Sequence, residues 1–163
     1  LYLLILIIDG NPVIFKQQRF CQNNTNYLVY KFRTMGKNLG DIPTHLIKDP
    51  INQLSIMGPF LRRFSLDEIP QLINVIRGEM VFIGPRPALH NQDDLIQLRT
   101  DKGLHKLKPG ITGWAQVNGR DKLSIREKVA LEEYYLNHKS LSLDLKIILM
   151  TLFQLLFPTN VSH

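Results

Sequence analysis

Apolar residues recur along the chain at two different spacings, which predict short strands between longer helices. From Tyr27 to Arg33 the side chains alternate, so Val29, Lys31 and Arg33 share one face of a strand. Two cations on the same strand face most simply indicate a face in contact with solvent. The pattern as a whole predicts one helix-rich α/β domain, of the α+β kind. Strands are expected at residues 13–15, 27–33 and 81–83, and helices at residues 66–77, 91–101, 124–138 and 141–157.

The expected helix at residues 66–77 is amphipathic. Its apolar residues recur every three or four positions, which places them on one stripe of a helix surface. Asp67, Gln71 and Asn74 fall on the opposite face, and Gly78 is a typical helix end. The spacing therefore predicts a helix with a polar face opposite its apolar stripe. The stripe comprises Leu66, Ile69, Leu72, Ile73 and Ile76.

Two adjacent carboxylates, Asp67 and Glu68, stand at the start of this helix, shortly after Arg62 and Arg63. Both have a structural explanation. Glu68 completes a capping box with Ser65, and the helix dipole favours an acidic residue in the first turn. A proline at the fifth helical position disturbs this regular start, because it has no N–H for a backbone bond. An ionised aspartate can attack phosphorus and a neighbouring glutamate can hold Mg²⁺, so a catalytic role is the alternative.

Both ends of the chain are apolar. Residues 1–8 would form a helix of roughly 12 Å, whereas a bilayer core is about 30 Å thick, so this run cannot span a membrane alone. It fits a buried strand, the end of a core helix, or the tail of a longer membrane-inserted helix. The chain has no initiator Met, so we expect a fragment or a processed product. The helix at residues 141–157 fits a core helix or a membrane-surface helix.

Composition excludes several classes of protein. With 44% hydrophobic and 21% charged residues, the chain is not intrinsically disordered. Its single cysteine, Cys21, excludes an internal disulfide and a cysteine-based zinc cluster. A net charge of +6 and a pI near 9.6 favour an anionic partner. That partner is a nucleic acid, an anionic membrane or a phosphorylated substrate.

Three further segments have recognisable local chemistry. In residues 84–87, prolines on both sides of Arg86 fix the backbone and hold the guanidinium for a phosphate, although most such tetrapeptides are plain turns. Residues 110–120 form a glycine-punctuated loop or short strand, in which Trp114 is most simply a core residue. Ser124 and Glu127 form the capping box of the helix at residues 124–138.

Five motifs, in this order, resemble those of the bacterial sugar transferase family, the monotopic polyprenyl-phosphate phosphoglycosyl transferases. The resemblance extends from about Asp9 to the end of the chain, and five ordered motifs make it specific. The motifs are KFRTM at residues 31–35, LRRFSLDEIPQL at 61–72, NVIRGEM at 74–80, GPRP at 84–87 and KPGITGWAQVNGR at 108–120.

The resemblance implies a reaction. Members of that family transfer a sugar 1-phosphate from a UDP-sugar to polyprenyl (undecaprenyl) phosphate, release UMP, and so start a capsule, exopolysaccharide, O-antigen or related glycan. The catalytic pair corresponds to Asp67, which becomes a covalent phosphosugar ester, and Glu68, which helps to bind Mg²⁺. The cations implied as substrate contacts are Arg86, Lys31, Arg33, Arg62, Arg63 and Arg120. The identity of the donor sugar is not determined, and an N-acetylated hexose or 6-deoxyhexose is slightly favoured over a simple hexose.

The resemblance also implies a location. Family members have a re-entrant N-terminal membrane helix, so residues 1–8 would be the returning half of that helix and residues 9–163 the catalytic domain. The domain would lie on the cytoplasmic face of the inner membrane, with its apolar N- and C-terminal helical segments in contact with lipid.

Two other classes of function compete with this interpretation. A non-catalytic module that docks on anionic lipid would use the acidic pair only as a helix cap. A nucleic-acid binder is suggested by charge alone, because no aromatic and basic residues interleave in an RNA-binding motif, and we expect no nucleic-acid partner.

Overall fold

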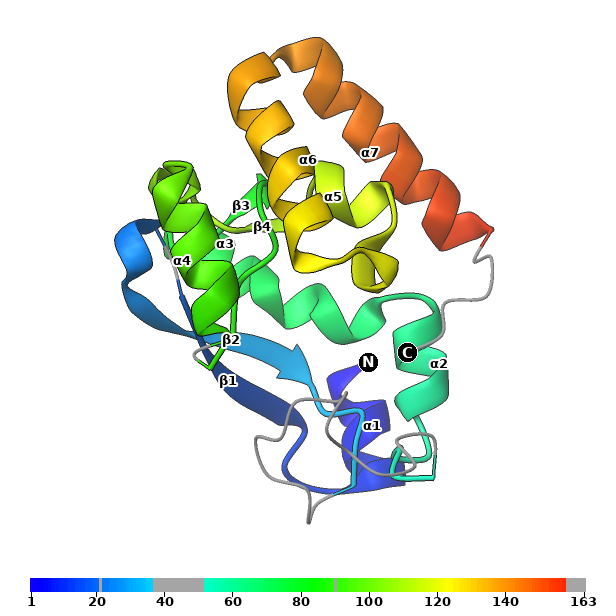
Figure 1. Cartoon of the computed structure of the whole chain (residues 1–163). Helices are drawn as coiled ribbons and strands as arrows, with labels where there is room; N and C mark the ends of the chain where they lie inside the picture. The colour runs from blue at the N-terminus through cyan, green and yellow to red at the C-terminus, as the bar shows by residue number, and fades with distance from the viewer. Residues whose placement is uncertain (21, 37–51, 90, 158–163) are drawn as a thin grey trace.

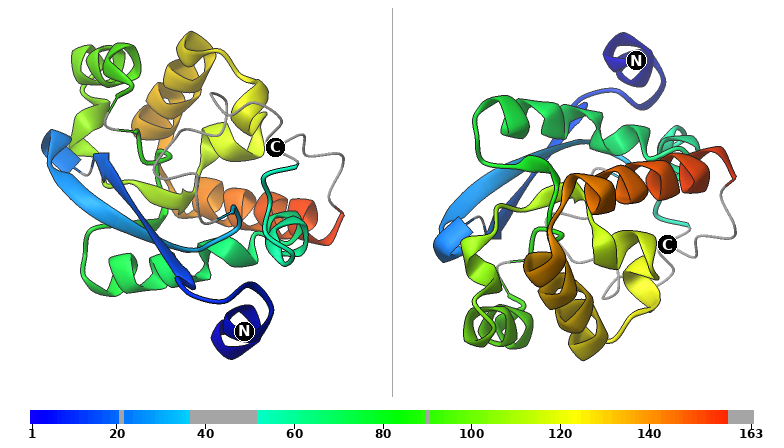
Figure 2. Two further views of the ribbon diagram at one scale, coloured as in Figure 1. Left: turned by 90° about the horizontal axis from the view of Figure 1, so that it is seen from below. Right: turned by 90° about the horizontal axis from the view of Figure 1, so that it is seen from above.

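The computed structural model describes residues 1–20, 22–36, 52–89 and 91–157. Cys21 lies outside these ranges. In the described residues, helices pack against two small two-stranded sheets (Figures 1 and 2), which confirms the helix-rich α/β class. The strands are β1 (Ile14–Phe20), β2 (Asn26–Phe32), β3 (Val81–Ile83) and β4 (Gly110–Thr112). The α-helices are α1 (Tyr2–Asp9), α2 (Gly58–Arg63), α3 (Leu72–Ile76), α4 (Asp93–Asp101), α5 (Trp114–Val117), α6 (Ile125–His138) and α7 (Leu141–Leu156). Short 3₁₀ helices are η1 (Gln22–Asn24), η3 (Leu66–Gln71), η4 (Leu104–Lys106) and η5 (Arg120–Lys122).

Strands β1 and β2 form an antiparallel hairpin, in which Ile14 pairs with Phe32. The strand expected at residues 27–33 is confirmed to within one residue, whereas β1 continues beyond the expected residues 13–15 through a polar run. The interpretation of the Lys31 and Arg33 face as solvated is wrong. Val29 on that face is 2% exposed and Arg33 is 6% exposed. These cations therefore have partners inside the protein.

The expected helix at residues 66–77 is divided into η3 and α3. Pro70 lies inside η3 and is buried, so the backbone stays in the 3₁₀ form through the first six residues. The expected capping box of Ser65 and Glu68 is wrong. Ser65 adopts the left-handed region with φ 51°, and its hydroxyl makes no cap bond. Glu68 is thus available for other contacts.

The amphipathic segment η3–α3 turns its apolar stripe outward. Ile76 is 86% exposed and Ile73 44% exposed, whereas Gln71 and Asn74 on the polar face are 4% and 0% exposed. The reason lies in β2, whose free edge needs hydrogen-bond partners. The Asn74 carboxamide supplies them through the backbone of Leu28 and Tyr30. The hydrogen bonds to the backbone of β2, and not the apolar stripe, therefore set the orientation of this segment.

The N-terminal run forms helix α1, so the alternative of a buried strand is wrong. Ile5 is fully buried against Val13, Phe32 and Leu61, while most other apolar side chains of α1 are exposed. Arg33 fixes the end of the helix, because its Nη2 donates to the carbonyl oxygen of Asp9 at 2.8 Å and to that of the following Gly10 at 2.9 Å. Within the described residues, no helix combines the length and the apolar character that crossing a bilayer requires.

The C-terminal half is a layer of helices around the parallel pair β3–β4. The capping box of Ser124 and Glu127 is present at the start of α6, and α7 begins where the sequence predicts. Arg99 on α4 and Glu132 on α6 form a bidentate ion pair that joins these two helices. Both side chains are buried, at 9% and 3% exposure. Trp114 is only partly buried and stacks on Tyr134 at 6.0 Å.

We predict that the Arg99–Glu132 pair makes single substitutions costly. Glu132→Gln should lower the free energy of unfolding by about 3–5 kcal/mol, because it leaves the Arg99 guanidinium buried without a counter-charge. The double variant Arg99→Met/Glu132→Leu should lose less than Glu132→Gln alone. Urea unfolding of the three proteins measures both values, and a double variant less stable than the single one would contradict the prediction.

Candidate functional site

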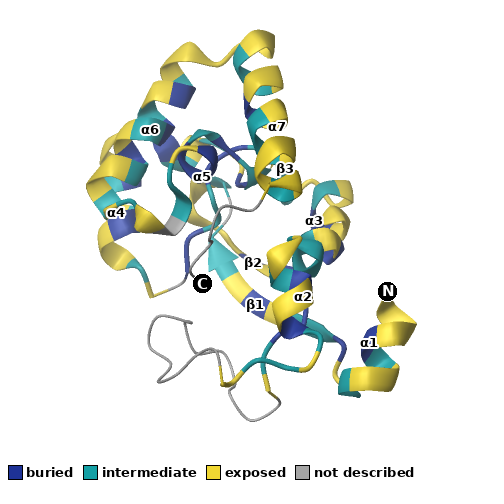
Figure 3. Cartoon of the chain, turned by 90° about the vertical axis from the view of Figure 1, so that its right-hand side faces the viewer, coloured by how far each residue is buried: buried dark blue, intermediate teal, exposed yellow. Residues whose placement is uncertain are grey.

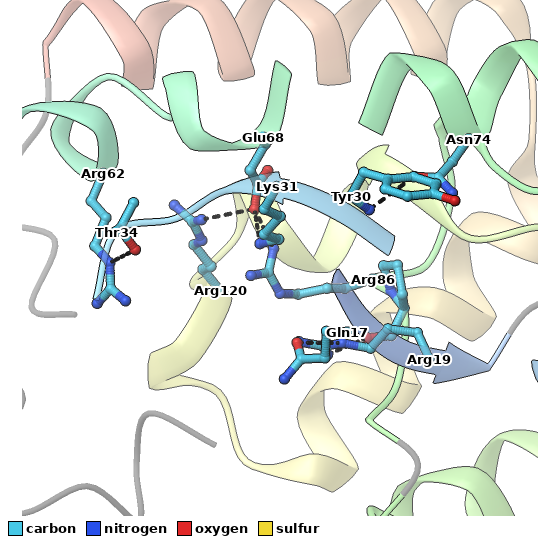
Figure 4. A network of polar contacts seen from close by, with 11 residues as sticks. Gln17, Arg19, Tyr30, Lys31, Thr34, Arg62, Glu68, Asn74, Arg86 and Arg120 are labelled. Atoms are coloured by element: carbon cyan, nitrogen blue, oxygen red, sulfur yellow. Dashed lines mark hydrogen bonds and ion pairs between the residues drawn. The ribbon is translucent and has the colours of Figure 1, made fainter. Parts of the chain in front are cut away.

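Four segments that are distant in the sequence bring charged side chains to one place (Figure 4). Strand β2 contributes Lys31 and η3 contributes Asp67 and Glu68. The loop after β3 contributes Arg86, and η5 contributes Arg120. The sequence motifs that carry these residues are therefore parts of one site.

Glu68 is the centre of this cluster. Its Oε1 lies 2.9 Å from Nζ of Lys31, 3.5 Å from Nη1 of Arg86 and 3.9 Å from Nη2 of Arg120. Its side chain is only 11% exposed. Burial alone would raise the pKa of Glu68, but the three cations lower it well below its usual range. Glu68 is consequently a permanent anion that holds three cations together.

Asp67 differs from its neighbour. Among the described residues no hydrogen bond or ion pair reaches its carboxylate. Burial raises the pKa of Asp67, while the charges of Lys31, Arg62 and Arg120 oppose the shift. Two adjacent carboxylates are thus driven in opposite directions, a pattern typical of groups with different chemical roles.

Residues with a strained backbone stand at the start of two segments of the cluster, η3 and η5. Ser65, two residues before Asp67, has φ 51°, and Arg120 has φ 52° after Gly119 at φ 150°. Non-glycine residues rarely adopt positive φ, and such strain concentrates at functional sites. The left-handed conformation of Ser65 sets the direction in which η3 begins, and Glu68 of η3 then reaches Lys31 on β2.

Three glycines allow the Arg86 loop to lie close to β4. A Cβ on Gly110 would lie 2.1 Å from the nitrogen of Gly84, and one on Gly113 would lie 2.1 Å from the Gly84 oxygen. The loop is then fixed by the Gly110 N–H, which donates to the Pro85 carbonyl at 2.8 Å. This contact holds Arg86 at a set position relative to Glu68.

Arg62 lies on α2, close enough to Asp67 for their charges to interact. Its Nε donates to Thr34 Oγ1 at 3.0 Å, which fixes the guanidinium beside the end of β2. Burial lowers the pKa of Arg62, and Asp67 opposes the shift. Burial likewise lowers the pKa of Lys31, which Glu68 opposes.

Two of the expected substrate contacts lie elsewhere. Arg33 bonds the C-terminal end of α1, and the exposed Arg63 lies over the ring of Phe64 at 5.6 Å. Within the described part of the chain, neither forms an ion pair with Asp67 or Glu68. The structure therefore brings together Lys31, Arg86 and Arg120, with Arg62 nearby, and does not bring Arg33 or Arg63 to them.

The donor set fits a magnesium ion that is shared with substrate. Mg²⁺ takes carboxylate oxygens and commonly uses one or two of them together with substrate phosphates. Asp67 has both oxygens free of hydrogen bonds among the described residues, and Glu68 uses only Oε1 for its three cations. In those residues no group of three or more acidic, His or Cys side chains surrounds a metal position. Glu68, through its Oε2, thus fits as the protein ligand of Mg²⁺ in the presence of phosphate oxygens.

Sequence reasoning missed two residues that support the site. Arg19 on β1 donates from Nη1 to the Pro87 carbonyl at 2.9 Å and so anchors the Arg86 loop. Asn74 bonds β2, the strand that carries Lys31. Asn74 stands in the motif at residues 74–80, but its place on the polar helix face concealed its burial. Nothing in the local sequence of Arg19 indicates its partner.

A family model for bacterial sugar transferases matches residues 1–158. The chain belongs to the bacterial sugar transferase family. This confirms the resemblance inferred from the five motifs. The fold described above is thus that of a member of this family.

Three relatives illustrate the range of this family. The chain is 42% identical over 156 residues to the uncharacterized sugar transferase EpsL of Bacillus subtilis, covering 94% of this chain and 75% of EpsL. It is 38% identical over 161 residues to the UDP-glucose:undecaprenyl-phosphate glucose-1-phosphate transferase of Escherichia coli, covering 93% of this chain and 34% of that enzyme. It is 35% identical over 166 residues to the galactosyl transferase CpsE of Streptococcus agalactiae, covering 93% and 36%. The chain thus spans most of EpsL but only about a third of the other two.

We predict opposite stability effects for the two carboxylates at pH 7. Asp67→Asn should raise the melting temperature, because it removes a charge that burial disfavours. Glu68→Gln should lower the free energy of unfolding by about 1–3 kcal/mol, because three cations lose their shared anion. Calorimetry of both variants measures the effects.

The pH dependence provides the control for this prediction. The pKa of Asp67 is raised in the folded protein, so its ionisation costs stability as pH rises. On acidification Asp67 becomes protonated, so the gain in melting temperature from Asp67→Asn should shrink before the loss from Glu68→Gln does. The pKa of Glu68 is lowered, so its contribution is complete above the usual glutamate pKa and should persist to lower pH. Equal melting temperatures for both variants at pH 7 would contradict the assignment.

Proposed function

We propose that this sugar transferase moves a sugar 1-phosphate from a UDP-sugar to polyprenyl phosphate, releases UMP and passes through a covalent phosphosugar ester of Asp67. The observation that supports this most is the contrast between the two carboxylates: Glu68 is bound by three cations, whereas Asp67 has no hydrogen-bond partner among the described residues. A nucleophile must be free, and the cations beside it must be held at fixed positions.

In the first step a carboxylate oxygen of Asp67 attacks the β-phosphorus of the donor. The bond between that phosphorus and the oxygen bridging to the α-phosphorus breaks, and UMP leaves with the bonding electrons. Lys31, Arg86 and Arg120 stabilise the phosphate charges, because they are already ordered around Glu68 and need little reorganisation. In the second step an oxygen of polyprenyl phosphate attacks the same phosphorus and releases Asp67 as a carboxylate.

The cofactor in this proposal is Mg²⁺, which Glu68 would hold together with the donor phosphates. When bound, it would neutralise part of the charge on the diphosphate. The low pKa of Glu68 keeps this ligand ionised throughout the physiological pH range.

The names of the relatives guide the choice of sugar. One is named for transfer of glucose 1-phosphate from UDP-glucose to undecaprenyl phosphate, and another is a galactosyl transferase. These names favour a simple hexose over the N-acetylated or 6-deoxy sugars that the sequence slightly favoured. We therefore propose UDP-glucose as the first donor to test, in a pathway that starts an exopolysaccharide or capsule.

We predict that the protein in lipid nanodiscs, with undecaprenyl phosphate, Mg²⁺ and UDP-glucose, releases UMP. Asp67→Asn should reduce the rate at least about 10³-fold, because no other group replaces the nucleophile. UDP-galactose and UDP-N-acetylglucosamine serve as alternative donors, and EDTA should stop the reaction. A luminescent UMP assay measures the rates.

Intact mass spectrometry separates the covalent route from direct transfer. Without the lipid acceptor, the wild-type protein should gain the mass of one phosphosugar and Asp67→Asn should gain none. UMP release by Asp67→Asn at the wild-type rate would exclude Asp67 as nucleophile. Absence of UMP with every donor, in protein that is folded and lipid-bound, would favour the lipid-docking module instead.

We further propose that this domain lies on the cytoplasmic leaflet of the bacterial inner membrane, with the exposed apolar sides of α1, α3 and α7 against lipid. These three helices lie along one side of the molecule, and much of their outward surface is exposed (Figures 2 and 3). Exposed side chains there include Ile7 at 80%, Ile76 at 86% and Leu149 at 66%. Exposed apolar side chains gathered on one side of a protein are typical of membrane-contacting proteins, and the net charge of +6 suits an anionic leaflet.

We predict that Ile73→Glu weakens binding to vesicles of phosphatidylglycerol and phosphatidylethanolamine at least about threefold, because it places a charge in the lipid contact. The matched control is Tyr134→Glu on α6, since Tyr134 is 45% exposed and Ile73 is 44% exposed. Vesicle flotation measures binding. Equal losses for both variants would show that general surface charge, and not the α1–α3–α7 side, controls binding.

A further inference from the structure

Asn74 is completely buried, although it belongs to a short helix whose outward side is apolar. Burying a carboxamide is unfavourable unless its polar atoms are hydrogen-bonded. Asn74 meets this condition with three bonds. Its Nδ2 donates to the Leu28 carbonyl at 2.7 Å and to Glu79 Oε2 at 2.7 Å, and its Oδ1 accepts from the Tyr30 N–H at 3.2 Å.

Two of these bonds join Asn74 to the backbone of β2. Leu28 and Tyr30 are two residues apart, so one side chain bonds a carbonyl and an N–H as a neighbouring strand would. The bonds therefore fix how far η3–α3 can slide along β2.

Lys31 follows Tyr30 directly on β2, and its Nζ lies 2.9 Å from Glu68 Oε1. Glu68 lies on the same η3–α3 segment as Asn74. Two polar contacts of this segment with β2 thus lie side by side: Asn74 bonds the backbone of Leu28 and Tyr30, and Glu68 binds the side chain of the next residue, Lys31 (Figure 4). A slide by one residue would turn Lys31 away from Glu68, because side chains alternate along a strand.

We propose that Asn74 is a positioning residue of the sugar transferase site, which fixes η3–α3 against β2 and so holds Lys31 at Glu68, in place for the phosphates of the donor. Its effect on activity rests on the proposed function. Asn74 itself contacts neither carboxylate of the catalytic pair, so it is a positioning residue and not a catalytic one.

A double-variant cycle tests this dependence. Lys31→Met should lower kcat about 100-fold, in the range seen for loss of one charge-stabilising donor. Asn74→Ala should lower kcat about tenfold while leaving KM for UDP-glucose within about threefold. The double variant should lose about 100-fold, not the 1000-fold expected for independent residues, because Asn74 has nothing to position once the Lys31 ammonium is gone.

Tyr135→Phe is the matched control. Tyr135 is 2% exposed and its hydroxyl donates to Asp144 at 2.7 Å, so this variant also removes a buried hydrogen bond. It should lower the melting temperature, keep kcat within about twofold, and combine additively with Lys31→Met. If Asn74→Ala fails to fold, Asn74→Asp replaces it, since it retains the acceptor for Tyr30 and loses both donors.

The same cycle measured by urea unfolding separates this proposal from the proposed function. Asn74→Ala and Lys31→Met should together destabilise less than the sum of their separate effects, whether or not UMP is formed. Absence of UMP from the wild type, with this non-additivity present, would reject the reaction and retain the positioning role. Additive effects on both kcat and stability would overturn the positioning role, even if the wild type makes UMP.

Discussion

One carboxylate oxygen, Oε1 of Glu68, connects the parts of this protein that form its site. Lys31, Arg86 and Arg120 come from a strand, a proline-rich loop and a 3₁₀ helix, and all three contact this atom at 2.9–3.9 Å. Cations at such distances repel one another in a partly buried setting unless an anion lies between them. Glu68 therefore holds three cations from distant segments on one surface, where the proposed reaction requires them for the donor phosphates.

The two neighbouring carboxylates differ in their effect on stability: Glu68 is stabilised in its position and Asp67 is not. Glu68 gains from its position, since its cations hold its pKa low. Asp67 is disfavoured there, since burial raises its pKa and no hydrogen bond among the described residues compensates. The positive φ of Ser65 adds a further local cost. A group kept free of hydrogen bonds at a cost to stability is typical of a nucleophile, and the surrounding contacts offset that cost.

The family is shown by the sequence, and the structure shows what individual motifs contribute to the charged cluster. The motif at residues 31–35 supplies a cation from β2, the motif at 61–72 supplies both carboxylates, and the motif at 108–120 supplies close-packing glycines and Arg120. The motif at 74–80 contributes no charge to the cluster. Its role is in Asn74, which joins the carboxylate segment to the strand.

The sequence by itself determined the local structure, because hydrophobic spacing and capping are properties of neighbouring residues. It predicted the strand at 27–33, the capping box of Ser124 and Glu127 and the last helix, and the family motifs pointed to Lys31, Glu68, Arg86 and Arg120, which the fold brings together. Only the tertiary structure decided which face of η3–α3 is buried. Asn74 hydrogen-bonds the edge of β2, which is 44–46 residues away in the sequence, so the spacing of neighbouring residues does not reveal this contact. The tertiary structure alone decided that Arg33 bonds the end of α1 while Lys31 reaches Glu68. Both are cations of one strand face, and their difference depends on which distant segment lies opposite each of them.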